Sequence, residues 1–321
     1  MSGGETIGVD LGGTKMLIGV LSEAGTDPLY EQREASTGQT EDELVELLVR
    51  EVTEARDACP DVVAVGLGVP ATIDHDKGVA VAAVNLPLSD VPLREIVSER
   101  VGLPVFVDND ANVAAYAEYL FGAAKGMPHM VMLTVGTGIG GGLILGGEVY
   151  RGSTGAGAEL GHIVIQADGP PCQGNCPNHG CVESLASGTA LGREGRAVAE
   201  SSPDSAVGKM LAEGREIDGH AVTEAALAGD EAAIGVFDLI GGRLGVACAS
   251  LANIFQPDAI VVGGGVIAAG DLLLEPARRE LRQRALNPMN RTPILEATLG
   301  NDAGMIGAAA MARNELAAVS A

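Results

Sequence analysis

Tryptophan is absent from this sequence, and aromatic residues of any kind are few. Phe, Tyr and Trp together make up 2% of the 321 residues, whereas hydrophobic residues make up 46%. The hydrophobic share excludes a disordered chain, and the core must be built from Val, Leu, Ile and Ala. The length predicts two domains, each large enough for its own core.

Basic residues are also scarce. The chain has 20 of them, four being lysines, against 43 acidic residues, which gives a formal net charge of −23. Such a surface repels the phosphates of DNA and RNA, so no nucleic-acid partner is expected. An anionic ligand would need local help from backbone amides, a lysine or a metal ion.

Targeting and membrane signals are missing as well. Residues 1–5 lack the basic head and apolar stretch of a signal peptide. The longest nearly apolar run, residues 259–270, is too short to span a bilayer and is interrupted by glycines. We therefore expect a soluble cytoplasmic protein without a membrane partner.

Cysteines are few and odd in number, and three of the five are clustered. Cys172, Cys176 and Cys181 lie close together, a spacing that in a cytosolic protein favours a metal over disulfides. With a nearby histidine they supply the Cys₃His set of a structural Zn²⁺ site, although three reduced cysteines in a glycine-rich loop are the alternative. Both His162 and His179 are available, and the crowding of His179 between two cysteines favours His162.

Two carboxylates flank this cluster, Glu159 before it and Glu183 after it. Each alone is typical of an exposed surface carboxylate. Their position on either side of a metal cluster indicates a site that also binds something polar.

Strand and helix patterns alternate along the chain. Strands are expected within 5–35 (three of them), and at 62–69, 104–108, 130–135, 143–145, 163–165 and 259–262. Helices are expected at 41–58 behind the cap Thr40, at 92–101, from about Asn109, and at 188–200, 230–255, 270–286 and 302–317.

Both halves open with strand, glycine turn and strand, and both continue as alternating β and α segments. This pattern predicts an α/β protein of two similar domains. We place the boundary near residue 116, within a helix. Domain 1 is then 1–115, completed by the C-terminal helix at about 302–321, and domain 2 is 116–301 with the cysteine loop.

The first glycine turn has the residues of a phosphate site. In Asp10-Leu11-Gly12-Gly13-Thr14-Lys15, the glycines let backbone amides approach a phosphate, Thr14 adds a hydroxyl and Lys15 a cation. Asp10 is placed to hold a hydrated Mg²⁺. A P-loop is excluded because a strand pattern follows instead of a helix, and a plain β-hairpin turn is the alternative.

Two further glycine segments are candidates in the second half. Gly136-Thr137-Gly138-Ile139-Gly140-Gly141-Gly142 corresponds to the first turn and is again followed by a strand pattern, which makes it a weak dinucleotide fingerprint. Gly263-Gly264-Gly265 follows a strand and admits either a flat adenine or ribose, or close packing of a helix.

Polar residues gather where the strand at 104–108 ends. Asp108-Asn109-Asp110 precedes a helix, and Asp and Asn are preferred N-cap residues. A carboxylate at the C-terminal end of a strand also suits a general base acting on a hydroxyl. The sequence leaves both interpretations open.

Taken in order, six segments resemble the ROK family of sugar kinases, most closely its bacterial-type glucokinases. They are Asp10-Leu11-Gly12-Gly13-Thr14-Lys15, Asn85-Leu86-Pro87, Asn109-Asp110-Ala111-Asn112, Gly136-Thr137-Gly138-Ile139-Gly140-Gly141-Gly142, Glu159-Leu160-Gly161-His162 and Gly180-Cys181-Val182-Glu183. The resemblance implies a two-domain actin-like, hexokinase-like (ribonuclease H-like) α/β fold that closes over a cleft. It also implies a homodimer.

The resemblance assigns roles to the sugar site. It implies Asp110 as the base for the sugar 6-hydroxyl, with Asn109, Glu159, His162 and Glu183 binding the other hydroxyls. The segment at Asn85 would form a wall of the same pocket. The family's histidine binds Zn²⁺ through one ring nitrogen and sugar through the other, which implies His162 as fourth ligand beside Cys172, Cys176 and Cys181.

The resemblance also assigns the nucleotide site. ATP with Mg²⁺ would lie across Gly12, Gly13, Thr14 and Lys15, with Thr137 and Gly138 contacting its phosphates and adenosine near Gly264. Zinc would organise the sugar pocket without taking part in the chemistry.

Two departures from the family's pattern matter. The usual Cys-x-Cys is Cys172-x3-Cys176 here, as in some relatives, so Cys172 is the least certain ligand. The Trp that often follows Asn-Leu-Pro is replaced by Leu88-Ser89-Asp90, which weakens the inference for one pocket wall.

The leading hypothesis is an ATP-dependent glucokinase of carbohydrate metabolism and glycolysis. Fructose, mannose or N-acetylmannosamine as acceptor, and polyphosphate as donor, remain open. A sugar-sensing ROK repressor is disfavoured because the first strand pattern begins near Glu5, without a DNA-binding module before it. A zinc-stabilised binding protein without catalysis is disfavoured because Asp110 and the Thr14-Lys15 turn are present.

Overall fold

The computed structural model describes residues 4–23 and 25–320, and within them the chain folds into two compact units. Unit 1 comprises Met1–Pro128, Gly142–Ala158 and Thr298–Ala321, and unit 2 comprises His129–Gly141 and Glu159–Ala297.

Part of the N-terminal segment considered for a signal peptide, residues 1–3, lies outside the described residues. The boundary expected near residue 116 falls within a helix of unit 1, α3 (Asp110–Leu120).

Unit 1 is built on a five-stranded sheet of order β3-β2-β1-β4-β8, beside a small sheet of order β5-β6-β7. Its strands are β1 (Glu5–Leu11), β2 (Lys15–Leu21), β3 (Tyr30–Ala35), β4 (Val62–Val69), β5 (Ala71–Asp74), β6 (Val79–Ala83), β7 (Ser89–Val91) and β8 (Val105–Asn109). Its α-helices are α1 (Glu41–Ala58), α2 (Leu93–Val101), α3 (Asp110–Leu120) and α10 (Ala303–Val319), the last preceded by the 3₁₀ turn η4 (Gly300–Asp302).

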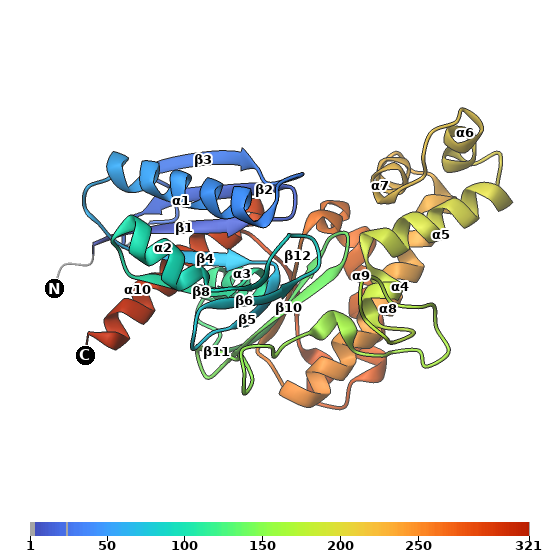
Figure 1. The fold of residues 1–321 in the computed structure, drawn as a ribbon. Helices are drawn as coiled ribbons and strands as arrows, with labels where there is room; N and C mark the ends of the chain where they lie inside the picture. The colour runs from blue at the N-terminus through green and yellow to red at the C-terminus, as the bar shows by residue number, and fades with distance from the viewer. Residues whose placement is uncertain (1–3, 24, 321) are drawn as a thin grey trace. The chain divides into compact units, whose positions relative to one another are not determined.

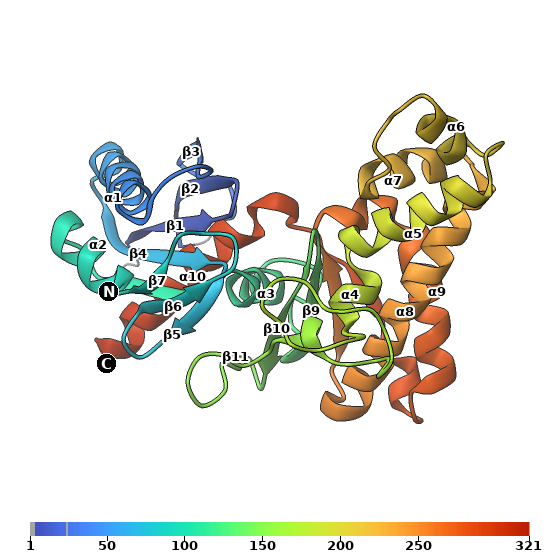
Figure 2. The ribbon, with the colours of Figure 1, turned by 45° about the vertical axis from the view of Figure 1, so that its right-hand side comes forward.

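The two faces of the large sheet are covered by different helices (Figures 1 and 2). Because side chains alternate along a strand, Ile7 and Val9 of β1 join the buried cluster that includes Leu44 of α1. Gly8 points to the opposite face, where a Cβ would collide with the carbonyl oxygen of Met305 in α10. Gly66 of β4 meets α10 in the same way.

The first helix confirms its sequence signals. Thr40 caps α1 in a capping box, in which its side chain accepts from the Glu43 amide while the Glu43 carboxylate accepts from the Thr40 amide. The helix begins and ends where the apolar spacing predicts.

The second large sheet has the order β11-β10-β9-β12-β13. Its strands are β9 (His129–Val135), β10 (Ile139–Leu145), β11 (Glu148–Val149), β12 (Ala259–Gly263) and β13 (Ile294–Glu296). The helices of unit 2 are α4 (Val182–Ala186), α5 (Gly188–Ser201), α6 (Ala206–Ala212), α7 (Gly219–Leu227), α8 (Glu231–Phe255) and α9 (Asp271–Arg284), with the 3₁₀ turns η1 (Leu160–His162), η2 (Gly265–Ala269) and η3 (Met289–Arg291).

The strand expected at 163–165 is wrong. This segment makes an isolated bridge between Val164 and Cys181, with hydrogen bonds from the Val182 amide to the Ile163 carbonyl and from the Ile165 amide to the Gly180 carbonyl, both 2.9 Å, and is not part of a strand. Its one neighbour is the returning cysteine loop, which is too short and irregular to form a ladder. The small sheet β5-β6-β7 and the helices α6 and α7 were not predicted.

The helix α8 is long and apolar enough, by length and composition alone, to cross a membrane. More than half of its apolar window, 56%, is buried inside the protein, where it packs against α4, α5, α7 and α9. That is the environment of a core helix in a globular unit.

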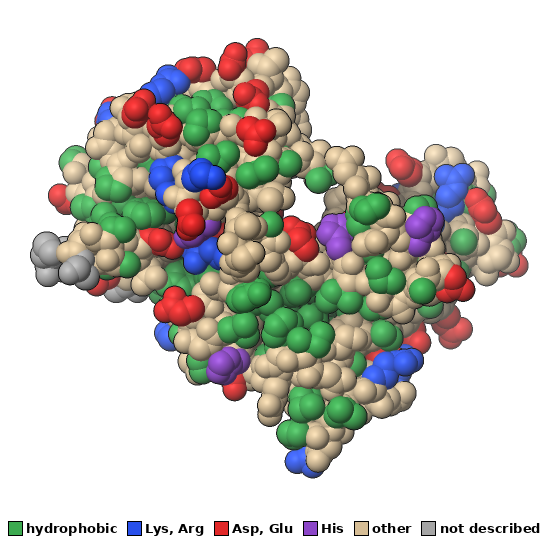
Figure 3. All heavy atoms as spheres, turned by 60° about the horizontal axis from the view of Figure 1, so that its bottom comes forward, with side chains coloured by type: hydrophobic (Ala, Val, Ile, Leu, Met, Phe, Trp, Pro, Cys, Tyr) green, Lys and Arg blue, Asp and Glu red, His purple; other side chains and the backbone are tan. Residues whose placement is uncertain are grey.

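Acidic side chains are scattered over the face drawn in Figure 3 and are interrupted by apolar and neutral surface. The large negative charge is therefore not gathered into one acidic patch on this face.

Candidate active site and metal centre

The first glycine turn is a β-hairpin in unit 1. Strands β1 and β2 are antiparallel, and the Gly12 amide donates to the Lys15 carbonyl across the turn, 2.9 Å. Ser36, which is 2% exposed, supports the turn from below: its hydroxyl donates to the Gly12 carbonyl at 2.6 Å and its amide to the Thr14 carbonyl at 3.1 Å. Ser36 was not among the predicted site residues, because nothing in the sequence marks it except its place directly after β3.

The Asn85 segment lies beside this turn. A Cβ added to Gly13 would stand 3.1 Å from the Asn85 Cβ, a tight contact that shows how closely the two segments approach. Two of the six segments that carry the resemblance therefore meet in unit 1.

The hydrogen bonds of Asn109 show which of the polar residues at the start of α3 caps the helix. Its side-chain oxygen accepts from the amides of Ala111, 2.9 Å, and Asn112, 3.3 Å, which makes Asn109 the N-cap. Its side-chain nitrogen donates to the Ala71 carbonyl at 3.3 Å, and an amide group has one further N–H. Asp110 is the first residue of the helix, and the cap does not require its carboxylate.

Asp10 and Asp110 influence each other electrostatically. The pKa of Asp10 is raised to about 7: burial is the largest cause, the negative charge of Asp110 adds to it, and the Lys15 ammonium opposes both. The N-terminal turn of α10 also approaches this carboxyl, since a Cβ at Gly304 would lie 2.6 Å from the Asp10 Cγ. Two carboxylates beside a glycine hairpin suit a hydrated divalent cation.

The second glycine turn, in unit 2, is built around Glu183. The Gly136 amide donates to the Gly138 carbonyl at 2.9 Å, and the Ile139 amide donates to the Glu183 Oε2 at 2.8 Å. A Cβ at Gly138 would collide with the same carboxylate. Glycine at 138 thus leaves the space that the Glu183 carboxylate occupies.

A cavity of about 640 Å³ opens beside this turn, within unit 2. It is lined by the second turn, the start of α5, the loop into α7 and the start of η2, including Gly136, Thr137, Gly188, Thr189, Arg193, Arg196, Asp218, His220, Gly265 and Val266. The volume is that of a small-molecule site.

Gly264 stands behind this cavity, in close contact with β9. Its φ is +86°, and a Cβ would lie 2.5 Å from the Val135 carbonyl oxygen. Of the two interpretations offered above, close backbone packing is therefore present, and the next residue, Gly265, lines the cavity.

The cavity residues of α5 and α7 were missed by the sequence analysis. A signal was available in Ser187-Gly188-Thr189, where a cap residue and a glycine begin a helix. The Gly188 amide donates to the Gly136 carbonyl at 2.7 Å, which joins this helix start to the second turn. Arg193, Arg196 and His220 gave no pattern because they come from two separate helices.

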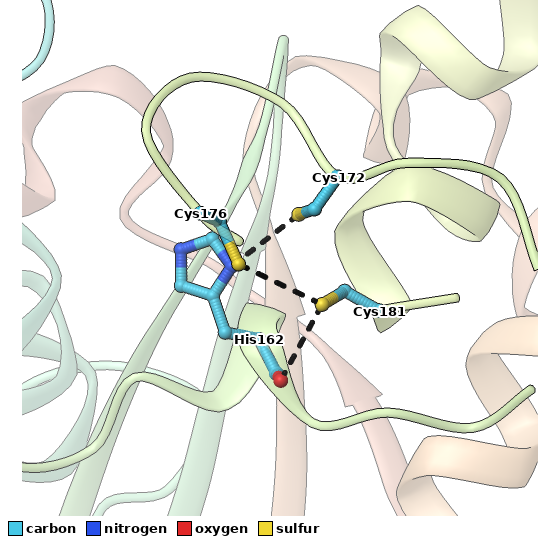
Figure 4. Close-up of side chains that lie close together, drawn as sticks. All are labelled: His162, Cys172, Cys176 and Cys181. Atoms are coloured by element: carbon cyan, nitrogen blue, oxygen red, sulfur yellow. Dashed lines mark hydrogen bonds between the residues drawn. The ribbon is translucent and has the colours of Figure 1, made fainter. Parts of the chain in front are cut away.

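The four predicted metal ligands converge in unit 2 (Figure 4). The ligand atoms of His162, Cys172, Cys176 and Cys181 all lie within 4.8 Å of one another. The Cys176 and Cys181 sulfurs are 3.9 Å apart, and His162 Nδ1 is 3.5 Å from the Cys172 sulfur. Tetrahedral Zn²⁺ sets ligating sulfurs about 3.8 Å apart and a sulfur–nitrogen pair about 3.5 Å apart, so the donor set fits zinc.

His179 lies outside this group. Its Nδ1 is 3.3 Å from the Gly169 carbonyl oxygen, and its backbone pairs with Pro171. Gly180, next to it, has a φ of +66°, and a Cβ there would collide with the Gln166 carbonyl oxygen. That turn directs Cys181 inward and leaves the neighbouring His179 exposed.

Burial raises the pKa of the Cys172 thiol and of the Cys181 thiol above the ordinary value. Three neighbouring thiols in this position can lose their protons together only when a cation balances the charge of the thiolates. A divalent metal supplies that charge, and its binding releases the protons.

The two flanking carboxylates are placed differently. Glu183, in the first turn of α4, has its Oε1 3.8 Å from the Cys172 sulfur while its Oε2 binds the second glycine turn, so one side chain joins the metal cluster to that turn. Glu159 is exposed, directly before η1, which ends in His162.

The sequence matches the ROK family over residues 6–315, and the chain belongs to that family. It is 39% identical over 316 residues to a glucokinase of Streptomyces coelicolor, a match that covers 97% of this chain and 98% of the relative. The crystal structure of a ROK family glucokinase from Streptomyces griseus in complex with glucose and AMPPNP is 39% identical, with a TM-score of 0.84, and the match covers 97% of this chain and all of that one. A putative xylose repressor of a Caldicellulosiruptor species is 33% identical, and the match covers 98% of this chain but 79% of the repressor.

These comparisons confirm the expected family and the two-domain α/β fold class. Each unit brings its own predicted residues together. In unit 1 these are the first turn, Asn85, Asn109 and Asp110, and in unit 2 they are the second turn, Glu183 and the four metal ligands.

The raised pKa of Asp10 predicts an unusual pH dependence of stability in the absence of divalent cations. The folded-state pKa of about 7 lies above the reference value of 3.8, so the folded protein keeps a proton that the unfolded chain releases. Stability is then lost as the pH rises from about 4 through 7. Asp10→Asn removes this loss and should stabilise the protein by roughly 1–2 kcal/mol at pH 8, allowing for partial exposure of the side chain, and much less at pH 4.5.

Thermal unfolding of both proteins at the two pH values measures the difference, with the exposed Asp204→Asn as matched control. An Asp10→Asn effect of equal size at pH 4.5 and pH 8 would contradict the assignment.

Proposed function

We propose that the protein is an ATP-dependent hexose kinase that transfers the γ-phosphoryl group to the 6-hydroxyl of glucose. The observation that carries the proposal is the proximity of Asp10 and Asp110 in unit 1, where the charge of one raises the pKa of the other and Lys15 opposes it. A base beside a phosphate-binding turn is the arrangement that phosphoryl transfer to a hydroxyl requires. The glucokinase names of the relatives specify the reaction further.

Asp110 is the general base. Its carboxylate accepts the proton of the 6-hydroxyl as that oxygen attacks the γ-phosphorus, and the bond from phosphorus to the bridging oxygen of the leaving diphosphate breaks. Asn109 caps the helix with its side-chain oxygen and so contributes to sugar binding only as a donor, through its remaining N–H. Phosphoryl transfer depends mainly on positioning and charge neutralisation, so few catalytic side chains are needed.

Asp10, with the turn Gly12, Gly13, Thr14 and Lys15, holds the phosphates and their Mg²⁺. When bound, Mg²⁺ neutralises charge on the transferring phosphoryl group. The backbone amides of the hairpin approach the phosphate oxygens, and Lys15, which is exposed, adds a cation.

The donor is a nucleotide rather than polyphosphate. The cavity of about 640 Å³ in unit 2 has the size for a nucleoside. Polyphosphate would need a run of cations, whereas Glu216 and Asp218 line this cavity together with Arg193 and Arg196. Thr137 and Gly138 contact the phosphates, and the nucleoside lies near Gly264.

Glu159, His162 and Glu183 bind sugar hydroxyls together with Asn85. Two carboxylates and an imidazole offer hydrogen bonds that a hexose ring satisfies at several positions, and hydroxyl-binding carboxylates discriminate strongly against analogues that lack the hydroxyl. Fructose, mannose and N-acetylmannosamine present related patterns and are the alternative acceptors.

Zinc held by His162, Cys172, Cys176 and Cys181 organises this sugar site. His162 faces the cluster with Nδ1, which leaves Nε2 for the sugar. Glu183 lies next to the Cys172 sulfur and is in the first turn of α4, two residues after the ligand Cys181. The metal thus acts through the orientation of sugar-binding residues. A homodimer, a cytoplasmic location and a role in glycolysis stay predictions.

The function is tested with a panel of sugars against ATP and polyphosphate, with phosphorylated product detected by mass. Glucose with ATP should give the highest kcat/KM, and polyphosphate should give little product. Because one similar relative is named a repressor, sugar binding is measured in parallel. Sugar binding without turnover of any pair would indicate a sensor and would overturn the kinase proposal.

Asp110→Asn should lower kcat by at least about 10³-fold while glucose affinity changes less than about threefold, because only the proton acceptor is lost. Asp74→Asn is a control carboxylate in the same unit, hydrogen-bonded to Lys77 on the surface. Steady-state kinetics and calorimetric titration with glucose measure the two quantities. Substantial turnover by Asp110→Asn would remove Asp110 from the base role.

Loss of zinc should weaken glucose binding by about tenfold or more while ATP affinity changes less than about twofold. Cys176→Ser breaks the cluster without touching a proposed sugar ligand, and Cys59→Ser is the matched control outside it. Elemental analysis should find about one zinc per chain in Cys59→Ser and His179→Ala, and much less in Cys176→Ser. Equal losses of glucose and ATP affinity in Cys176→Ser would count against an organising role.

A further inference from the structure

The residues on either side of Asp110 are held by a single buried carboxylate. Asp108, near the end of β8, is 1% exposed. Its Oδ1 accepts from the Asn109 backbone amide at 2.7 Å and from the Asn112 side-chain nitrogen at 2.9 Å. Its Oδ2 accepts from the Nε of Arg151 at 2.6 Å.

Arg151 attaches this carboxylate to two other segments of unit 1. Its Nη2 lies 3.3 Å from the Glu315 Oε1 of α10, and its carbonyl accepts from the Gly157 amide at 2.8 Å, which closes the loop after β11. The same Glu315 oxygen is 3.3 Å from the Nε2 of His75, whose Nδ1 lies 3.2 Å from the Val107 carbonyl oxygen. The end of β8 is thus held at two points, at the Asp108 side chain by Arg151 and at the Val107 carbonyl by His75.

The stability of the fold does not by itself account for this network. A buried ion pair contributes little to stability compared with well-packed apolar residues of similar size. What it adds is direction, because hydrogen bonds fix a side chain in both distance and angle. Here the direction is given to the residues before and after the proposed base.

We propose that Asp108 and Arg151 are a positioning pair for the proposed kinase reaction: they hold Asn109 and the first turn of α3 so that Asp110 stands at the sugar hydroxyl. The inference rests on the proposed function. Arg151 also neutralises Asp108, so that Asp110 is the carboxylate whose charge faces the positive end of the α3 dipole.

The test compares two partly buried arginines of unit 1. Arg151→Met removes the ion pair and keeps most of the aliphatic stem. Arg313→Met removes an arginine that donates to the Thr6 hydroxyl and to the carbonyls of Leu21, Ser22 and Glu23. Both variants should lose stability. Arg151→Met should also lower kcat about tenfold to hundredfold, with the KM for glucose and for ATP changed less than about threefold. Arg313→Met should keep its kcat.

Arg151→Lys restores a cation to Asp108 without the second branch toward Glu315, and it should recover at least about a third of the lost activity. If Arg151→Met does not fold, Asp108→Asn and Arg151→Lys replace it in the same kinetic comparison. A kcat that is unchanged in Arg151→Met, or lowered equally in Arg313→Met, overturns the positioning role while the kinase activity of the unchanged protein stands. An unchanged protein that phosphorylates no sugar overturns both proposals.

Discussion

The close approach of α10 to the sheet of unit 1 is the constraint on which the rest of that unit depends. Gly8 and Gly66 have no room for a side chain because the α10 backbone, at Met305 and Ala308, occupies the space. A composition with few aromatics and many glycines and alanines allows this contact. It brings the N-terminal turn of α10 against the Asp10 carboxyl, and the burial that results is the largest cause of the raised Asp10 pKa.

The same packing positions the other carboxylate. A Cβ on Gly307 of α10 would collide with the Val113 carbonyl of α3, the helix that begins with Asp110. One helix therefore fixes the strand that contains Asp10 and the helix that starts at Asp110. A small distance between two acids is costly when both are ionised, and a divalent cation with phosphates offsets that cost. The electrostatic repulsion between Asp10 and Asp110 therefore lies where the proposed substrate and its cation would offset it.

In unit 2, the Glu183 side chain joins two parts of the proposed site. One oxygen receives the Ile139 amide of the second turn, and the other lies beside the Cys172 sulfur. A change at the metal cluster therefore reaches the glycine turn through one side chain and the short helix α4. Tight turns such as the one at Gly180 direct the ligands inward, so the cluster organises a loop that has almost no regular structure of its own.

The sequence predicted features whose cause is local. The capping box of Thr40, the hairpin at Gly12 and the cysteine spacing each depend on residues within one turn or loop, and each is found as expected. The cavity beside α5 could not be predicted, because Arg196 and His220 meet only after two helices pack. The strand expected at 163–165 failed because alternating side chains require a partner strand, and the chain supplies only one bridge there.

The start of α3 shows why motif reading alone cannot separate structural from chemical roles. Three adjacent polar residues were equally suited to capping and to catalysis. In the folded chain Asn109 caps the helix, and Asp108 anchors its first turn. Asp110 lies between Asn109 and Asn112, and both of these residues are hydrogen-bonded to Asp108, so its position is fixed from two sides. A general base needs such a fixed position, because proton transfer and nucleophilic attack must occur in one geometry. This is the physical reason to propose Asp110 as the base.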